Sequence, residues 1–256
     1  MLESGKKIEK CNILGTDIAV ISVDEVVQYI IQHIEQLRGQ YICVSNVHTT
    51  VMAYEDKSYQ TIQNSAALAL PDGKPLSVVS KINGYKNAQR VTGPDLMEVL
   101  FSKPVKHFFY GGKQEVLRDL EDNIRKRHPD IQIAGMYSPP FRNLTDEEDR
   151  KVIEKINNSR PDVVWVGLGA PKQEKWMYDH RKQIDALMIG VGAGFDYHAG
   201  VIKRAPAWMQ KASLEWLYRL HQDPKRLWKR YLSTNFKFLW LILLDMKDKR
   251  KVSKRI

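Results

Sequence analysis

The chain has 256 residues, of which 43% are hydrophobic, so it can bury the core of one large domain or of one domain with an appendage. Its formal net charge of +10 favours an anionic partner, either a membrane surface or a nucleic acid. Two cysteines in separate segments exclude a disulfide framework, and a polar start excludes a signal peptide. The longest apolar run has seven residues, far fewer than the roughly 20 of a membrane-spanning helix, so we expect a cytoplasmic protein.

Apolar runs of strand length alternate with helical patterns along residues 1–200. Capping boxes mark two helix starts, Ser22 with Glu25 and Thr145 with Glu148. Alternation of this kind predicts a Rossmann-like α/β fold, in which a mostly parallel sheet carries helices on both faces. The predicted strands are Ile18–Ile21, Tyr41–Val44, Ala67–Leu70, His107–Tyr110, Gln132–Met136, Asp162–Val166 and Leu187–Gly190.

Ligands of such sheets bind beyond the carboxyl ends of the strands, so the loops that follow the strands are the candidate site. The first informative loop is residues 71–75, which follows a predicted strand and contains Asp72 between a proline and a glycine. An acid in this position is well placed to face a cleft. Asp72 could equally cap the next helix or shape a turn, and the local sequence leaves both interpretations open.

A second loop, residues 167–176, follows a strand and opens a helix. Gly169 lets the backbone approach a ligand closely, and the helix start offers free N–H groups to a phosphate. Lys172 and Gln173 add side-chain donors at the same place. The alternative interpretation is a tight turn with a solvated, charged first helical turn.

A third glycine-rich loop, residues 190–198, resembles half of a dinucleotide fingerprint but lacks its spacing and its acidic partner. We therefore interpret it as a second wall of the same cleft, with Gly192 and Asp196 as binding residues. His198 at its end is a candidate acid or base, or a hydrogen-bonded structural histidine.

Arg90 could meet a phosphate, and Thr92 or Asp95 could cap the helix that follows. The chain has no Asp-x-Asp sequence and no His, Cys or carboxylate cluster with metal spacing. We therefore expect arginines, lysines and backbone N–H groups, rather than a metal ion, to neutralise any bound phosphates.

Together these segments resemble the WecG/TagA/CpsF family of bacterial glycosyltransferases. The resemblance covers nearly the whole chain in the expected order. The segments that carry it are 45–48, 71–73, 90–95, 167–176, 192–208, 204–211, 215–220 and 223–226.

The resemblance implies an inverting, metal-independent transfer of a sugar from a UDP-sugar to a sugar linked to a lipid diphosphate, with no cofactor. Asp72 matches the carboxylate that is proposed as general base, and Asn46, Arg90 and Gln173 match residues of the cleft. Well-studied members transfer N-acetylmannosamine or its uronic acid to N-acetylglucosamine on undecaprenyl diphosphate, so N-acetylmannosamine is the expected donor sugar. The product would be a cell-wall or surface polysaccharide, such as a teichoic acid.

One departure from the family concerns the residue two positions before Asn46. Several relatives carry a threonine there, whereas this chain has Val44. A hydroxyl contact is lost or is supplied by Ser45, and the identity of the two sugars depends on such contacts.

The basic charge is concentrated in a predicted helical appendage, residues 201–256. Residues 203–256 hold 15 Lys or Arg against 4 Asp or Glu, whereas residues 1–202 hold 25 against 26. In the resembling family this appendage sits on the membrane and helps to close the active site. The basic residues that could contact the diphosphate or the membrane are Arg204, Arg219, Arg226 and Arg230.

From residue 225 onward the apolar residues recur at three- and four-residue steps. Such a helix, with basic residues off the apolar face, is typical of one that lies on the inner face of the plasma membrane. The face could instead pack on the body or on a second subunit. A nucleic-acid-binding module is the non-enzymatic alternative, which the continuous apolar stripe disfavours. The face consists of Trp228, Tyr231, Leu232, Phe236, Leu239, Trp240 and Leu243.

Overall fold

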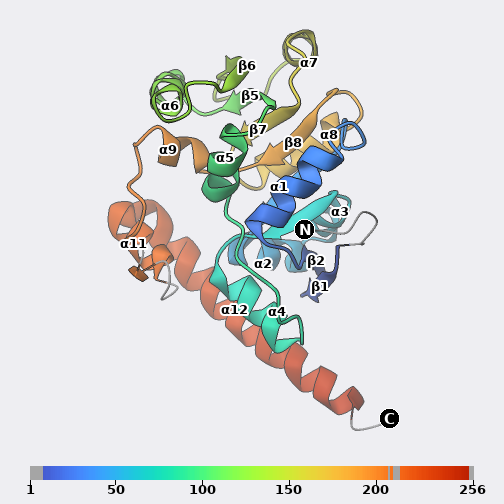
Figure 1. Cartoon of the computed structure of the whole chain (residues 1–256). Coiled ribbons are helices and arrows are strands. Elements are labelled where there is room, and N and C mark those ends of the chain that lie inside the picture. The colour runs from blue at the N-terminus through green and yellow to red at the C-terminus, as the bar shows by residue number, and fades with distance from the viewer. Residues whose placement is uncertain (1–7, 207, 210–213, 254–256) are drawn as a thin grey trace.

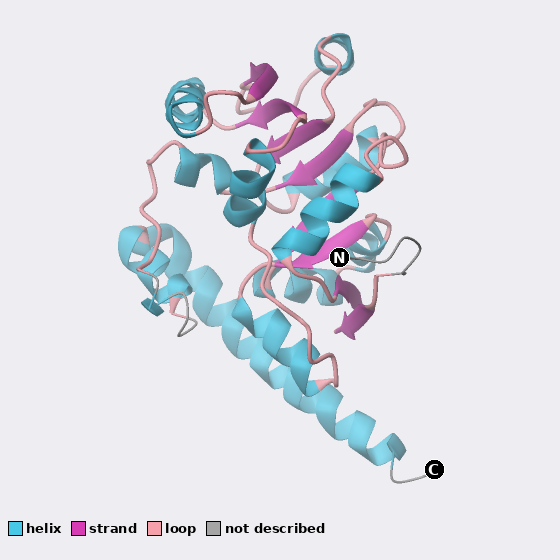
Figure 2. Ribbon diagram, in the orientation of Figure 1, coloured by secondary structure: helices cyan, strands magenta, loops and turns pink. Residues whose placement is uncertain are grey.

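A computed structural model describes residues 8–206, 208–209 and 214–253, except for the side chains of residues 226, 229, 230 and 248–253. Its described part contains an eight-stranded sheet of order β1-β2-β4-β3-β8-β7-β5-β6 (Figures 1 and 2). All neighbouring strands run parallel except β1 and β2. The strands are β1 (Lys10–Ile13), β2 (Thr16–Ala19), β3 (Tyr41–Ser45), β4 (Leu68–Pro71), β5 (Lys106–Gly111), β6 (Gln132–Tyr137), β7 (Val163–Gly167) and β8 (Leu187–Gly190).

Helices cover both faces of the sheet, which confirms the predicted fold class. One face carries α1 (Val23–Gln32), α5 (Gly93–Phe101), α6 (Gln114–Arg127) and α9 (Gly194–His198). The other carries α2 (Val47–Glu55), α3 (Lys57–Asn64), α4 (Lys74–Ile82), α7 (Asp146–Asn158) and α8 (Lys172–His180).

Alternation along the strands divides the apolar side chains between these two layers. In β3, Ile42 and Val44 enter one core, whereas Tyr41 and Cys43 enter the other. All five residues of β3 are buried, as expected for a parallel strand covered on both sides. Strand β3 therefore lies at the centre of the body.

The first hairpin was not predicted from the sequence. Strand β1 pairs with β2 in an antiparallel register, and the turn between them contains Leu14 and Gly15 with φ of 51° and 87°. The alternation in β1 is clear only in the structure, where Cys11 and Ile13 are buried while Lys10 and Asn12 are exposed. Four residues give too short a pattern to identify such an edge strand.

Two capping boxes predicted from the sequence are confirmed. The Ser22 hydroxyl and the Glu25 carboxylate satisfy each other's backbone N–H groups at the start of α1. Thr145 and Glu148 do the same at α7. These contacts fix the points at which the chain leaves the sheet.

The C-terminal segment contains α11 (Glu215–Gln222) and the long helix α12 (Pro224–Ser253). Phe238, Leu241 and Ile242 of α12 are buried and join the core beneath α2. Lys237 forms an ion pair with Glu55 at the end of α2. The carboxyl end of α12 reaches beyond the other elements (Figure 1). No helix in the described ranges is both long and apolar enough to cross a membrane.

Two phenylalanines that lie two positions apart on α12 test this packing. Phe238 is 2% exposed and Phe236 is 69% exposed. We expect Phe238→Ala to lower the free energy of unfolding by about 3 kcal/mol, because the substitution leaves a cavity between α12 and α2. Phe236→Ala should change it by less than about 0.5 kcal/mol. Equal effects of the two variants in denaturant unfolding would contradict the assigned contact.

Candidate active site

The connections of the sheet change direction at the carboxyl ends of β3 and β8. These strands pair in parallel, but α2 after β3 and α9 after β8 lie on opposite faces of the sheet. Such a change of direction opens a crevice at the strand ends. Asn46 directly follows β3, Asp72 directly follows β4, and Gly192 follows β8 by two positions. The sheet order therefore brings three of the predicted site residues to one edge.

Asp72 is held at the end of β4 by backbone contacts. Its N–H donates to the Ser45 carbonyl at 2.7 Å, which continues the β3–β4 ladder by one bond. The next residue, Gly73, has φ of 87° and precedes α4 without any side-chain cap. Asp72 therefore does not cap α4.

Asn46 orients the Asp72 carboxylate. The Oδ1 atom of Asn46 accepts the N–H of Thr49 at 3.2 Å and so caps α2. The side-chain NH2 group of Asn46 donates a hydrogen bond to the Asp72 carboxylate, which lowers the pKa of that carboxyl. One asparagine thus starts a helix and fixes an acid on the neighbouring strand.

The surroundings of Asp72 raise its pKa to about 6. Burial has the largest effect, and the nearby Glu215 carboxylate adds to it. Asn46, Arg90 and Arg219 act in the opposite direction. A carboxyl group with this pKa is ionised at neutral pH yet is a stronger base than an ordinary aspartate.

Helix α11 brings two charged side chains to the crevice. The Glu215 Oε2 atom accepts a hydrogen bond from Arg90 Nη1 at 2.6 Å. The Arg219 guanidinium lies 5.2 Å from the centre of the Tyr197 ring. Glu215 and Arg219 are four residues apart and share one face of α11.

Tyr197 of α9 belongs to the same group of side chains. Its pKa is raised to about 12 by burial, with Glu215 and Asp72 adding to the shift and Arg219 opposing it. The phenol therefore remains protonated at neutral pH. Asp72, Tyr197, Glu215 and Arg219 are thus mutual electrostatic neighbours that come from three different elements.

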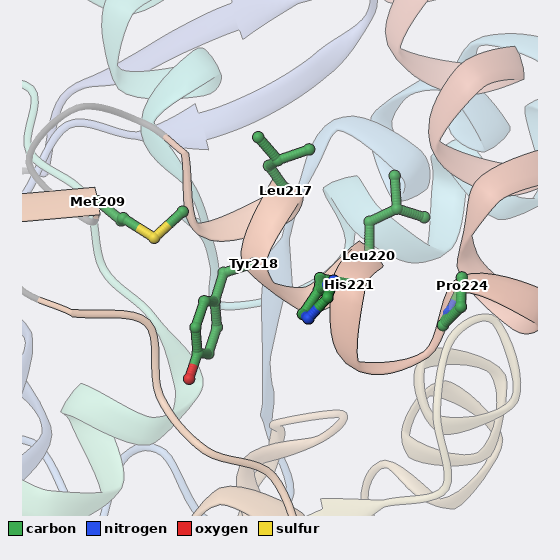
Figure 3. A pocket seen from close by; sticks show the side chains of 6 residues that line it. All are labelled: Met209, Leu217, Tyr218, Leu220, His221 and Pro224. Atoms are coloured by element: carbon green, nitrogen blue, oxygen red, sulfur yellow. The ribbon is translucent and has the colours of Figure 1, made fainter.

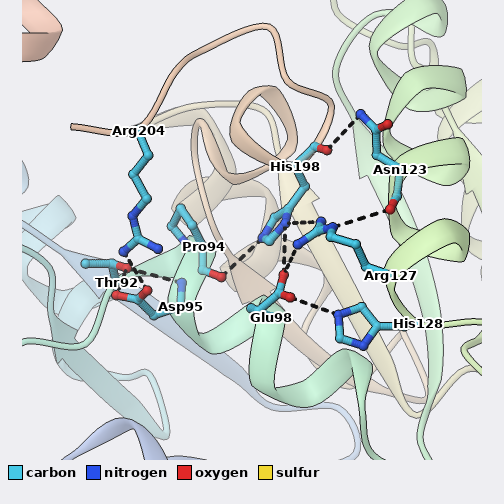
Figure 4. Close-up of polar contacts among 9 residues, drawn as sticks. All are labelled: Thr92, Pro94, Asp95, Glu98, Asn123, Arg127, His128, His198 and Arg204. Carbon is cyan, nitrogen blue, oxygen red and sulfur yellow. Dashed lines mark hydrogen bonds and ion pairs between the residues drawn. The ribbon is translucent and has the colours of Figure 1, made fainter. Parts of the chain in front are cut away.

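Arg204 contacts Asp95 in the first turn of α5 (Figure 4). Its Nη2 atom donates to Asp95 Oδ1 at 2.5 Å. The other oxygen of Asp95 accepts from Thr92 at 2.7 Å and from Arg90 at 3.4 Å. Thr92 also caps α5, as the sequence suggested. Two side chains of the C-terminal segment, Arg204 and Glu215, therefore bind the short stretch 90–95 at the start of α5.

The Gln173 side chain connects the two glycine-rich loops. Its Oε1 atom accepts the N–H groups of Gly169 at 3.2 Å and of Gly192 at 3.0 Å. Its amide nitrogen donates to Glu174 at 2.8 Å, and the side chain is buried. All of these contacts are within the protein, so Gln173 positions the loops.

The two loops themselves present open backbone. Gly169 and Gly192 have φ of 78° and 55°, and a Cβ at either position would meet no atom within 4 Å. Lys172 is exposed at the first position of α8, and Asp196 is partly buried on α9. These positions leave open space beside the two loops, although the N–H groups of Gly169 and Gly192 are themselves bonded to Gln173.

His198 lies away from these groups, in a cluster between α5, α6 and α9 (Figure 4). Burial lowers its pKa to about 4, so the ring is neutral. One ring nitrogen donates to the Pro94 carbonyl at 3.1 Å, and the other accepts from Arg127 at 2.9 Å. His198 is therefore a hydrogen-bonded structural histidine.

Arg226 and Arg230 were predicted to contact a diphosphate, but their side chains lie outside the described residues. In the described part of the chain, no group of three or more His, Cys, Asp or Glu side chains is placed to hold a metal ion. Glu215 and Tyr197 were not predicted as site residues. The one signal in the sequence is the four-residue step between Glu215 and Arg219, which places both side chains on the same face of a helix.

Comparison with known proteins identifies the family of the chain. Residues 11–252 match the family described as glycosyl transferase WecG/TagA/CpsF. A protein of Bacillus subtilis named N-acetylglucosaminyldiphosphoundecaprenol N-acetyl-beta-D-mannosaminyltransferase is 34% identical over 88% of this chain and 87% of its own length. Proteins of the same name from Bacillus spizizenii and Staphylococcus aureus strain MW2 are 34% and 30% identical, over 78% and 99% of this chain and 78% and 98% of their own lengths.

A family match that covers almost the whole chain, together with full-length relatives of this identity, establishes the class of protein. The match spans the whole sheet and the C-terminal helices except for one residue at each end, Lys10 of β1 and Ser253 of α12. The chain is a glycosyltransferase and belongs to the WecG/TagA/CpsF family.

Proposed function

We propose that the chain transfers N-acetylmannosamine from its UDP-sugar to N-acetylglucosamine on undecaprenyl diphosphate, with inversion and without a metal ion. The relatives' names support the two sugars and the lipid diphosphate. The observation that carries the proposal is Asp72, an oriented carboxylate with a raised pKa at the mouth of the crevice. The product would enter a cell-wall or surface polysaccharide.

Asp72 acts as the general base. It takes the proton of the acceptor hydroxyl while that oxygen attacks the anomeric carbon of the donor. The bond between the anomeric carbon and the β-phosphate oxygen breaks on the opposite side, and UDP leaves with that electron pair. One displacement needs one base, and it inverts the configuration.

Cationic side chains neutralise the leaving diphosphate in place of a metal ion. Arg219 faces Asp72 and Tyr197, and its planar guanidinium suits the geometry of phosphate oxygens. The open space beside Gly169 and Gly192 leaves room for the donor, and the exposed Lys172 nearby can add a positive charge. Arg204, Arg226 and Arg230 add positive charge to the same segment.

The C-terminal segment also docks the enzyme on the inner face of the plasma membrane. Apolar side chains along α12 are exposed among its basic residues, an arrangement suited to an anionic interface. Beside α11, an apolar hollow of about 490 Å³ adds to this surface (Figure 3). The exposed side chains are Trp208, Trp216, Trp228, Leu232, Phe236, Leu239, Trp240 and Leu243. Met209, Leu217, Tyr218, Leu220, His221 and Pro224 line the hollow.

Replacement of the base provides the first test. We expect Asp72→Asn to fold normally and to lower kcat at least about 100-fold, because an amide cannot accept the proton. Asp119→Asn, an exposed change of the same kind on α6, should have wild-type turnover. Transfer is measured by mass spectrometry with UDP-N-acetylmannosamine and the lipid-linked acceptor. Near-normal turnover of Asp72→Asn would exclude its role as base.

The pH dependence of kcat provides the second test. The base is active only when it is ionised, so activity is lost as the pH falls through the pKa of Asp72. We expect an acidic limb with a midpoint near pH 6, well above the ordinary aspartate value of 3.8. A rate that stays constant down to pH 5 would contradict the raised pKa.

Phe236 and Phe141, which are 69% and 87% exposed, form a matched pair for a test of membrane docking. Phe236→Gln should weaken sedimentation with phosphatidylglycerol-containing liposomes about tenfold, since one phenylalanine no longer enters the interface. Phe141→Gln, outside the C-terminal segment, should have no effect. Binding to duplex DNA but not to liposomes would favour the nucleic-acid alternative. Dissociation of a dimer by Phe236→Gln would instead assign this face to a second subunit.

A further inference from the structure

Four charged side chains of alternating sign connect the C-terminal segment to the body. Glu215 binds Arg90 at 2.6 Å, Arg90 approaches Asp95 at 3.4 Å, and Asp95 binds Arg204 at 2.5 Å. Arg90 and Asp95 belong to the body, whereas Glu215 and Arg204 belong to the segment. We call this set the charge chain. Its order makes each contact between segment and body an attraction of opposite charges.

Burial alone does not hold α11 in place. None of the eight residues of α11 is buried. Its ring contact with α12, between Trp216 and Tyr231 at 6.1 Å, lies within the C-terminal segment itself. The position of α11 over the body therefore depends on polar contacts, of which Glu215 to Arg90 is a direct hydrogen-bonded ion pair.

This ion pair is shielded from water more than a typical surface pair. The side chains of Arg90 and Glu215 are 22% and 24% exposed. Charges in such a position interact more strongly than fully solvated ones, and loss of one partner leaves the other poorly solvated. Glu215 is also one of only four acids among residues 203–256. Most charges of this segment are positive, so the negative charge of Glu215 is one of the few that can pair with Arg90 of the body.

The groups that face Asp72 come from every element around it. Glu215 and Arg219 belong to α11, Arg90 precedes α5, Asn46 starts α2, and Tyr197 lies on α9. Two of these five side chains are present only while α11 is docked. Docking of α11 therefore changes both the enclosure of the base and the charge around it.

We propose that Glu215 is a positioning residue that binds Arg90, holds α11 over Asp72 and so completes the site around the general base. This role rests on the proposed function of Asp72. In this role Glu215 is the side chain through which α11 is fixed to the body. Glu215 acts through Arg90 and α11 and transfers no proton itself.

The test compares three full-length variants, each of which removes one charge. Glu215→Gln removes the carboxylate beside the base. Arg204→Gln removes the second contact of the charge chain between segment and body, and Arg204 is not among the groups that shift the pKa of Asp72. Asp245→Asn is the control. Asp245 lies on α12, about 30 Å from the start of that helix and therefore far from α11. The readouts are the pH profile of kcat and the amide hydrogen exchange of residues 215–222.

Glu215→Gln should accelerate exchange in α11 about tenfold, because the ion pair with Arg90 is lost. It should also move the acidic limb of kcat to lower pH by about 0.5 unit or more, because a like charge no longer opposes ionisation of Asp72. Arg204→Gln should accelerate exchange without moving the limb. Asp245→Asn should change neither.

Unchanged exchange in Glu215→Gln, or faster exchange with an unmoved acidic limb, would overturn the proposal. Failure of the proposed function would look different. In that case Asp72→Asn would keep its turnover, while hydrogen exchange, which needs no activity, would still report whether Glu215 docks α11.

Discussion

Strand β3 pairs in parallel with β4 from Ile42 to Ser45 and with β8 from Tyr41 to Cys43. This pairing brings residues that are far apart in the sequence to one edge of the sheet. Asn46 can reach Asp72 only because their strands end side by side, and Gly192 follows the strand that pairs with β3 on its other side. A slip of β3 by one residue would exchange its two buried faces and separate the amide from the carboxylate.

The second requirement is the return of the C-terminal segment to this edge. Phe238, Leu241 and Ile242 fix α12 against α2, and α2 begins at Asn46. Apolar packing of α12 thus anchors a segment whose helix α11 is held by charge. The same segment exposes a separate apolar face. One helix pair can therefore contact the body and a membrane at once, which suits the lipid-linked acceptor that we propose.

Much of the fold could be predicted from the sequence because it is encoded locally. The seven predicted strands and both capping boxes are present, and Asp72 follows its strand as expected. The edge strand β1 was missed because four residues carry too little pattern. The contact of Glu215 with Arg90 spans 125 positions, and no local signal encodes such a distance. Gln173 follows a glycine-rich loop, as its sequence position indicates, but its buried contacts depend on two loops that meet only in the folded chain.

The helix α12 shows how an amphipathic pattern can be incomplete. The sequence indicated one apolar face, and its large side chains are mostly exposed. A second set, Phe238, Leu241 and Ile242, packs on the body instead. Periodicity alone could not assign these two sets, because both consist of large apolar residues at helical spacing. Only the position of α2 determines which set is buried.

The product of one reaction tests the central claim most directly. The full-length enzyme is incubated with UDP-N-acetylmannosamine and undecaprenyl-diphosphate-linked N-acetylglucosamine in the presence of EDTA, and the product is analysed by mass spectrometry and NMR. The account predicts one added N-acetylhexosamine whose anomeric configuration is the inverse of that in the donor. Retention of configuration, or a reaction that stops when EDTA is added and resumes with a divalent cation, would contradict it.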